Sequence, residues 1–174
     1  MPAAEILTGP RVRLRPPVVD DAEALFARIA SDPEVTRYLA WRPHPDVAET
    51  RRVITTLFNT GDDQTWLIEV AGEVVGLCGR RRPQPHIVDV GYCLARDWWR
   101  KGLMSEALSV LIDDARHDPA VYRVSAYCHV ENIGSAGVLR RCGLTLEGRL
   151  ARYGLFPNLG DEPRDALLFG MAVR

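Results

Sequence analysis

The chain has 174 residues, 47% of them hydrophobic and 26% charged, which suits one domain with a buried core. Its formal net charge of −1 at pH 7 gives no basic field that would recruit nucleic acid or an anionic membrane. No apolar run approaches transmembrane length, so we expect a single domain over residues 1–174 without a membrane or nucleic-acid partner.

The cysteines and the first residues indicate the compartment. The four cysteines are widely spaced and include no C-x-x-C pair. Each lies in an apolar segment, which favours buried reduced thiols over disulfides or metal ligands. The first five residues lack the basic and apolar regions of a signal peptide. We therefore expect a cytoplasmic protein without a metal.

The first half of the chain predicts a short strand, three helical segments and a hairpin. Residues 11–15 alternate apolar and charged side chains, as a half-buried strand does. Asp20 with Glu23, and Asp46 with Glu49, have the spacing of a capping box at a helix start. The expected segments are a strand at 11–15, helices at 20–30, 34–39 and 46–58, strands at 65–70 and 73–78, and a loop at 80–85 whose three arginines suit a solvated surface.

A strand, helix and strand unit is expected in the second half. Residues 87–94 form a buried strand, and apolar residues recur at three- and four-residue steps over 102–116. Residues 123–130 form a strand with Val124, Ala126, Cys128 and Val130 on one face and Arg123, Ser125, Tyr127 and His129 on the other. Such a unit has parallel strands and a right-handed crossover. With a helix at 133–142 and strands at 145–156 and 165–173, the fold class is a mixed, mostly antiparallel α/β sheet with helices on its faces.

The segment between that strand and its helix has the features of an anion site. A helix start leaves backbone N–H groups unpaired and carries the positive end of the helix dipole. Gly102 lets the backbone approach a ligand closely, and Arg100 and Lys101 are beside it. The nucleotide-binding patterns G-x-x-x-x-G-K-[ST] and G-x-G-x-x-G do not occur here. The alternatives are a phosphate pocket and an ordinary basic helix start.

The same residues resemble a known signature. Asp-Val-Gly-Tyr-Cys-Leu at 89–94, followed by Trp-Trp-Arg-Lys-Gly-Leu-Met-Ser-Glu-Ala-Leu at 98–108, resembles the acetyl-CoA signature of the GNAT N-acetyltransferases. The resemblance is best to the branch of ribosomal-protein N-terminal acetyltransferases, the RimJ/RimL type. The general pattern is Q/R-x-x-G-x-G/A, from which Trp99 and Met104 depart at its two ends.

A second block supports the resemblance. Residues 132–144 are similar to the family's Asn-x-x-Ser start and Leu-x-Lys/Arg-x-Gly-Phe ending, with Arg141 in the basic slot and Leu144 in place of Phe. The order and spacing match over nearly the whole chain. The resemblance implies a single GNAT domain, with a twisted sheet of about seven strands that splays at a central parallel pair. The pantetheine arm of acetyl-CoA would enter that gap.

The resemblance also implies where acetyl-CoA binds. Backbone groups of the splayed strand would pair with pantetheine, backbone N–H groups at the helix start would hold the pyrophosphate, and the second block would face the thioester. The implied contacts are Cys93, Leu94, Trp99, Arg100, Lys101, Gly102, Leu103, Met104, Asn132, Ser135 and Arg141.

Acyl transfer requires a neutral amine, stabilisation of the oxyanion and protonation of the leaving thiolate. The oxyanion role suits a backbone N–H near Cys93 or Leu94. The tyrosine that many GNAT relatives use as the acid corresponds to Leu139 here. The resemblance to the RimJ/RimL branch implies Ser135 as the thiolate donor, with a helix cap as the alternative. Base candidates are Asp89, which can instead orient its neighbours, and His129, which can instead be structural.

Acceptor contacts are expected from the loops, at Trp41, His44 and Tyr153. A protein α-amine has a pKa near 8 and a lysine amine one near 10.4, so an enzyme without an evident strong base suits α-amines. We therefore expect acetyl transfer from acetyl-CoA to a protein N-terminal α-amine. The alternatives are a small-molecule amine, such as an amino acid, polyamine or aminoglycoside, and a CoA-binding module without turnover. A homodimer is possible.

Overall fold

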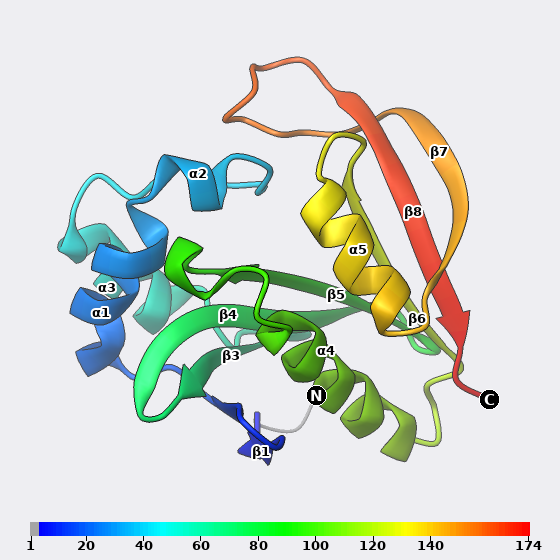
Figure 1. Cartoon of the computed structure of the whole chain (residues 1–174), viewed down its shortest axis with the longest axis horizontal. Helices are drawn as coiled ribbons and strands as arrows, with labels where there is room; N and C mark the ends of the chain where they lie inside the picture. The colour runs from blue at the N-terminus through cyan, green and yellow to red at the C-terminus, as the bar shows by residue number, and fades with distance from the viewer. Residues whose placement is uncertain (1–3) are drawn as a thin grey trace.

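The computed structural model describes residues 4–174, so the start of the segment considered for a signal peptide lies outside the described residues. Within these residues the strands form one sheet in the order β1-β2-β3-β4-β5-β6-β8-β7 (Figure 1). All neighbours pair antiparallel except β5 and β6, which confirms the predicted mixed sheet. The strands are β1 Leu7–Thr8, β2 Arg13–Arg15, β3 Asp63–Val70, β4 Glu73–Gln84, β5 Ile87–Leu94, β6 Arg123–His129, β7 Thr145–Gly154 and β8 Arg164–Ala172.

The sheet has eight strands in the described residues, where the sequence predicted about seven. The additional strand is β1, whose two residues pair with Arg13 and Leu14 of β2. Two residues are too few to show an alternating pattern, so sequence reasoning could not detect this strand.

Helices lie on both sides of this sheet. They are the 3-10 helix η1 Val19–Asp21, α1 Ala22–Leu25, the π-helical segment η2 Phe26–Ala30, α2 Pro33–Thr36, α3 Val47–Thr56, the 3-10 helix η3 Arg96–Trp98, α4 Leu103–His117 and α5 Ile133–Arg141. Leu108 and Leu111 of α4 pack on one face of the sheet, while Leu25 of α1 and Ile54 of α3 pack on the other. The prediction of helices on both faces is thus confirmed.

The predicted helix at 34–39 is shorter in the structure, where α2 ends at Thr36. Asp32 caps its start by accepting a hydrogen bond from the Glu34 N–H at 2.9 Å. The carbonyl of Thr36 accepts a hydrogen bond from the side-chain amide of Asn158 at 2.7 Å, and the same amide donates to the Trp41 carbonyl at 2.8 Å. The same Thr36 carbonyl accepts the Leu39 N–H at 2.8 Å, so the helix closes with a three-residue turn and does not continue in α-helical form.

The expected loop at residues 80–85 is instead largely the end of β4, which continues to Gln84. The Arg80 guanidinium donates to Asp114 and to Gln64, both at 2.6 Å, and lies 5.3 Å from the Trp66 ring centroid. The solvated-surface interpretation is therefore wrong for Arg80. Its acidic partner lies 34 residues away in the sequence, and no local pattern announces it.

The parallel pairing of β5 and β6 is short. It joins only residues 87–89 to residues 123–125. Beyond this point the remainder of β5 pairs only with β4, and the remainder of β6 pairs only with β8. Figure 1 shows the two strands diverging with α5 beside the opening. The predicted splay at the parallel pair is confirmed.

The four cysteines are free thiols; Cys78 and Cys128 are buried, and Cys93 and Cys142 are partly buried. The apolar face predicted for β6 is only half of its buried surface, because Ser125 and His129 are buried too. Both faces of the sheet are covered at this strand. Among residues 4–174, no helix combines the length and apolarity needed to cross a membrane.

Candidate active site

The start of α4 is held in a defined geometry. Gly102 is its N-cap residue and has φ +76°, a left-handed conformation that glycine adopts without steric cost. Glu106, in the first turn, accepts hydrogen bonds from the Arg11 N–H at 2.5 Å and Nε at 2.8 Å. Arg11 Nη1 also donates to the Lys101 carbonyl at 3.2 Å. The N-terminal segment thereby fixes the turn that precedes the helix.

A cavity of about 480 Å³ lies between this helix start, α5 and the end of β5. Positive charge reaches it from Arg100 and Arg141, and Arg141 Nε donates to Ser105 Oγ at 3.1 Å. We call it the donor cavity. The predicted acetyl-CoA contacts that line it are Cys93, Leu94, Trp99, Arg100, Gly102, Leu103, Met104, Asn132, Ser135 and Arg141.

Lys101 is the predicted acetyl-CoA contact that does not line this cavity. Its ammonium lies 4.9 Å from the centroid of the Trp98 ring, in a cation–π contact. Trp99 is half exposed, and its indole N–H donates to the Leu94 carbonyl at 2.6 Å. One tryptophan thus holds the lysine outside the cavity, while the other closes the loop onto β5.

Along β5, alternate residues direct their backbone N–H and C=O groups toward β4 or toward the opening between β5 and β6. The Ala95 N–H donates to the Val75 carbonyl of β4 at 2.8 Å. Bonds alternate along an antiparallel ladder, so Cys93, opposite Leu77, also uses its N–H and C=O toward β4. The backbone groups of Leu94 consequently point the other way, toward the splay. The geometry favours the Leu94 N–H over that of Cys93 as the oxyanion donor.

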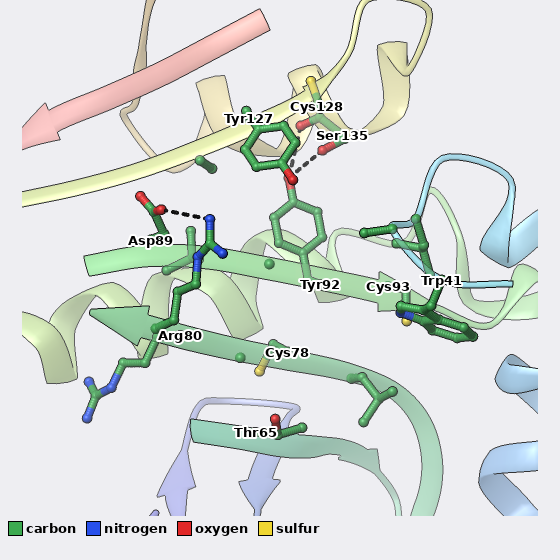
Figure 2. Close-up of a pocket in the computed structure, with 18 of the residues that line it drawn as sticks. Trp41, Thr65, Cys78, Arg80, Asp89, Tyr92, Cys93, Tyr127, Cys128 and Ser135 are labelled. Carbon is green, nitrogen blue, oxygen red and sulfur yellow. Dashed lines mark hydrogen bonds and ion pairs between the residues drawn. The ribbon is translucent and has the colours of Figure 1, made fainter. Parts of the chain in front are cut away.

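Tyr92 reaches across the splay to α5. Its hydroxyl lies 2.9 Å from Ser135 Oγ and 3.1 Å from the Ser135 carbonyl oxygen (Figure 2). The Ser135 N–H in turn donates to Oδ1 of Asn132, the N-cap of α5, at 3.1 Å. Burial raises the pKa of Tyr92, so this phenol stays protonated and serves as a neutral hydrogen-bond partner.

Sequence reasoning gave Tyr92 no role, although it lies inside the quoted motif. Its place in the alternation of side chains along β5 is the signal that could have identified it. The residues of β5 two apart share a face, and Tyr92 is on the face that α5 covers, opposite the Asn-x-x-Ser block. Recognising this required knowing that β5 and α5 meet at the splay.

A second cavity of about 370 Å³ adjoins the first, and we call it the acceptor cavity. Trp41, Phe58 and Phe156 form its apolar walls, and Tyr127 also lines it. The two cavities meet at Tyr38, Leu39, Tyr92, Cys93, Asn132 and Ser135, which line both.

Of the three predicted acceptor contacts, only Trp41 lines this cavity. His44 packs against it with ring centroids 5.2 Å apart, and its Nδ1 is 2.8 Å from Thr50 Oγ1. Tyr153 is 54% exposed and meets Tyr127 edge-on at 5.3 Å. His44 and Tyr153 therefore each contact a lining residue without lining the cavity themselves.

Asp89 lines the acceptor cavity at its far end. Its carboxylate accepts the Ser125 hydroxyl and lies 3.4 Å from Arg81 Nη2. Asp89 precedes Cys93 by four residues in an extended strand, a separation of about 13 Å at roughly 3.3 Å per residue. Figure 2 shows the two residues at opposite ends of this segment. The distance favours acceptor binding over proton abstraction at the junction.

His129 is also away from the junction. It is 4% exposed, stacks on Tyr38 at 5.1 Å, and meets Phe156 edge-on at 4.9 Å. Its Nδ1 accepts the Glu131 N–H at 3.2 Å, and burial lowers its pKa. Because it lines neither cavity, the geometry favours support of the two aromatic walls over base catalysis. Across residues 4–174, no three His, Cys, Asp or Glu side chains gather as a metal site.

Comparison with known proteins identifies the family. The model of the acetyltransferase (GNAT) domain matches residues 11–145. The chain belongs to the GNAT acetyltransferase family. The uncharacterized N-acetyltransferase p20 of Bacillus licheniformis is 31% identical to this GNAT chain over 156 residues, covering 86% of the chain and 87% of p20. The protein is accordingly an acyltransferase.

Solved structures share the whole GNAT fold. The acetyltransferase from Salmonella typhimurium that modifies the N-terminal serine of ribosomal protein L7/L12 has a TM-score of 0.85 at 22% identity, covering 98% of this chain and 100% of its own. RimL, the ribosomal L7/L12 α-N-protein acetyltransferase in complex with coenzyme A, has a TM-score of 0.84 at 22% identity, with 97% and 98% covered. At this identity the similarity establishes the fold.

Proposed function

We propose that this GNAT enzyme transfers the acetyl group of acetyl-CoA to the α-amine of a protein or peptide N-terminus. One observation carries the proposal: a donor cavity and an acceptor cavity meet at the hydrogen-bonded Tyr92–Ser135 pair. The S. typhimurium and RimL structures, whose names describe this reaction, share the fold and support the choice.

The donor cavity fits acetyl-CoA. The backbone N–H groups that follow Gly102 suit the pyrophosphate, because a helix start offers unpaired donors and a positive dipole. Arg100 and Arg141 add charge for the phosphates. The edge of β5 that lies beyond its pairing with β6 suits the pantetheine amides. The free thiols fit a reducing compartment such as the cytoplasm.

In the reaction, the amine nitrogen bonds to the thioester carbonyl carbon, and the carbon–sulfur bond then breaks. The Leu94 N–H stabilises the oxyanion that forms between these steps. Ser135 Oγ donates a proton to the departing sulfur and regains one from water in the same step, and the Tyr92 hydroxyl holds that serine in place at 2.9 Å. The amine loses its proton to water, because Asp89 and His129 both lie away from the junction.

The charge of the acceptor cavity supports a peptide. Its lining includes the carboxylates of Asp63 and Asp89 and the guanidinium of Arg81, which pairs with Asp89 at 3.4 Å; the Arg80 guanidinium is held by Asp114 and Gln64. A polyamine or aminoglycoside carries several positive charges and would require several unpaired carboxylates, more than this lining supplies. A peptide α-amine, about a tenth of which is neutral at pH 7, also needs no strong base.

Acetyl transfer to defined acceptors tests the proposal. Purified enzyme, acetyl-CoA and a panel of N-terminal peptides, polyamines and aminoglycosides would be followed by release of the CoA thiol and by mass spectrometry. We expect one acetyl group on the peptide α-amine, and none on peptides whose N-terminus is blocked but which keep a lysine. Acetylation confined to polyamines or aminoglycosides would overturn the assignment. Calorimetry with acetyl-CoA supplies an independent reading of donor binding.

A further inference from the structure

Three rows of residues on β3, β4 and β5 share the face of the sheet on which the acceptor cavity lies. In the registered strands β3, β4 and β5, residues directly opposite each other form a row, and successive rows on one face are two residues apart. The first row is apolar, the second is formed by Thr65 and two glycines, and the third is charged. The rows are Leu67–Leu77–Cys93, Thr65–Gly79–Gly91 and Asp63–Arg81–Asp89.

The middle row has no side chains on β4 and β5, so the backbone of its two glycines forms the floor of the acceptor cavity there. Gly79 and Gly91 face each other across β4 and β5, and both line the acceptor cavity. A side-chain carbon built on Gly91 would meet no atom within 4 Å, so space above this floor is open. On Gly79 the same carbon would lie 2.9 Å from the Gln64 carbonyl oxygen, so the neighbouring backbone requires that glycine.

The backbone N–H and C=O groups of this floor already have hydrogen-bond partners within the sheet. The ladder phase set by the Ala95–Val75 bond makes Gly79 and Gly91 a hydrogen-bonded pair, so their N–H and C=O groups are directed at each other. What remains is a flat, uncharged peptide surface flanked by the Thr65 hydroxyl on β3. Planar amide groups can pack on such a surface at close distance.

The floor leads away from the reaction point. Cys93, at one end, is among the residues where the two cavities meet, and Asp89 closes the other end. The two are about 13 Å apart along the strand, at roughly 3.3 Å per residue. An extended peptide covers that length with about four residues.

We propose that the glycine row is a subsite for the main chain of the acceptor's second to fourth residues, so that the enzyme selects an extended, unstructured peptide N-terminus. This inference rests on the proposed function and adds the length and conformation of the acceptor. An extended segment can lay its planar amides on this floor, whereas a helix keeps its amides along its own axis and presents side chains instead.

A peptide-length series tests the subsite. The kcat/KM for CoA release is measured with an amino-acid amide and with di-, tri-, tetra- and hexapeptide amides that share the first residue. We expect kcat/KM to rise by roughly tenfold up to the tetrapeptide, as amides pack on a preformed surface, and then to level off. A value that does not depend on length would overturn the subsite.

A matched pair of variants separates the floor from general effects. Gly91→Val fills the space above the floor, and its branched side chain suits a strand. Gly148→Val makes the same change on β7, where a side-chain carbon also meets nothing within 4 Å and neither cavity is near. We expect Gly91→Val to lose the length-dependent gain, measured relative to its own turnover of the amino-acid amide, and Gly148→Val to keep the wild-type gain.

The outcomes also distinguish this subsite from the proposed function. If both variants keep the length dependence, the glycine floor is wrong and peptide acetylation stands. If no peptide or amino-acid amide is acetylated, while another amine is, the proposed function fails and the subsite fails with it. A loss of acetyl-CoA affinity in Gly91→Val would also count against an acceptor-specific role.

Discussion

The hydroxyl of Tyr92 lies 2.9 Å from Ser135 Oγ and joins β5 to α5 across the open part of the sheet. The neighbouring strands β5 and β6 share no backbone hydrogen bonds at this point, because their pairing ends at Asp89 and Ser125. A pair of side chains therefore bridges the gap into which both cavities open. Under the proposed function, the hydroxyl held by this contact is the one that protonates the leaving thiolate.

Removing the Tyr92 hydroxyl should weaken turnover more than donor binding. Tyr92→Phe keeps the ring but removes a neutral hydrogen bond worth about 0.5–1.5 kcal/mol, so we expect kcat to fall by roughly two- to tenfold. The KM for acetyl-CoA should stay within twofold. Ser135→Ala should lower kcat further, and the double variant should be no worse than Ser135→Ala alone. Independent, additive losses would show that Tyr92 does not act through Ser135.

Substitution of Gly102 should weaken acetyl-CoA binding. A valine at φ +76° is strained by about 1–3 kcal/mol and brings a side chain to the phosphate site, so calorimetry should give a lower affinity. Gly72→Val is the control, because Gly72 has φ +82° in the β3–β4 turn and lines neither cavity. Both variants should lose thermal stability, but only the first should lose affinity. Equal affinities would contradict the phosphate loop.

Asp89→Asn separates acceptor binding from base catalysis. If Asp89 contacts the far end of the acceptor, this variant should raise the KM for a tetrapeptide while leaving kcat nearly unchanged. The pH dependence of kcat should keep its shape, because the removed carboxylate carries no proton in the reaction. A fall in kcat of several hundredfold, with the acidic limb of the pH profile lost, would restore Asp89 as the base.

His129 should influence stability near neutral pH. Its folded-state pKa is lowered by burial, so below the ordinary value of about 6.5 the unfolded chain binds a proton that the folded chain resists. The contribution of the buried neutral imidazole to folding stability is complete above that pH and declines as the pH falls below it. Denaturant unfolding at pH 7.5 and pH 5 should show this decline in wild type and a smaller one in His129→Phe, whose ring fits between Tyr38 and Phe156.

The same variant tests whether His129 is catalytic. His129→Phe should keep kcat within about threefold at pH 7.5, since the residue lines neither cavity. A collapse of kcat in a variant that remains folded would identify the imidazole as the base. The Glu131 N–H loses its acceptor in this variant, so an overall stability loss near 1 kcal/mol is expected at either pH.

The sequence predicted the elements that carry their own local signals. The βαβ unit follows from periodicity, and Gly102 from the turn that precedes a helix; the splay followed from the family resemblance. Long-range pairing had no such signal. Arg80 meets Asp114 from another element, and Lys101 lies over Trp98 instead of the donor cavity because side-chain direction depends on the folded loop.

The candidate site also contains residues that a local motif predicts and residues whose place depends on the folded chain. Residues in the two quoted motifs line the donor cavity, since a motif specifies a local loop and helix start. Acceptor residues depend on how loops meet: Trp41 reaches the acceptor cavity, whereas His44 turns to Thr50. Tyr92 and the glycine row become visible only once the strand register is known.

The amide of Asn158 ties together two distant parts of the chain, the carbonyls of Thr36 and Trp41. Of the residues in these segments, Trp41 and Phe156 line the acceptor cavity and not the donor cavity. Under the proposed function, substitutions at these two positions can change which molecules receive the acetyl group without loosening the grip on its carrier. Such a division allows lineages to acquire new recipients while the chemistry is inherited intact.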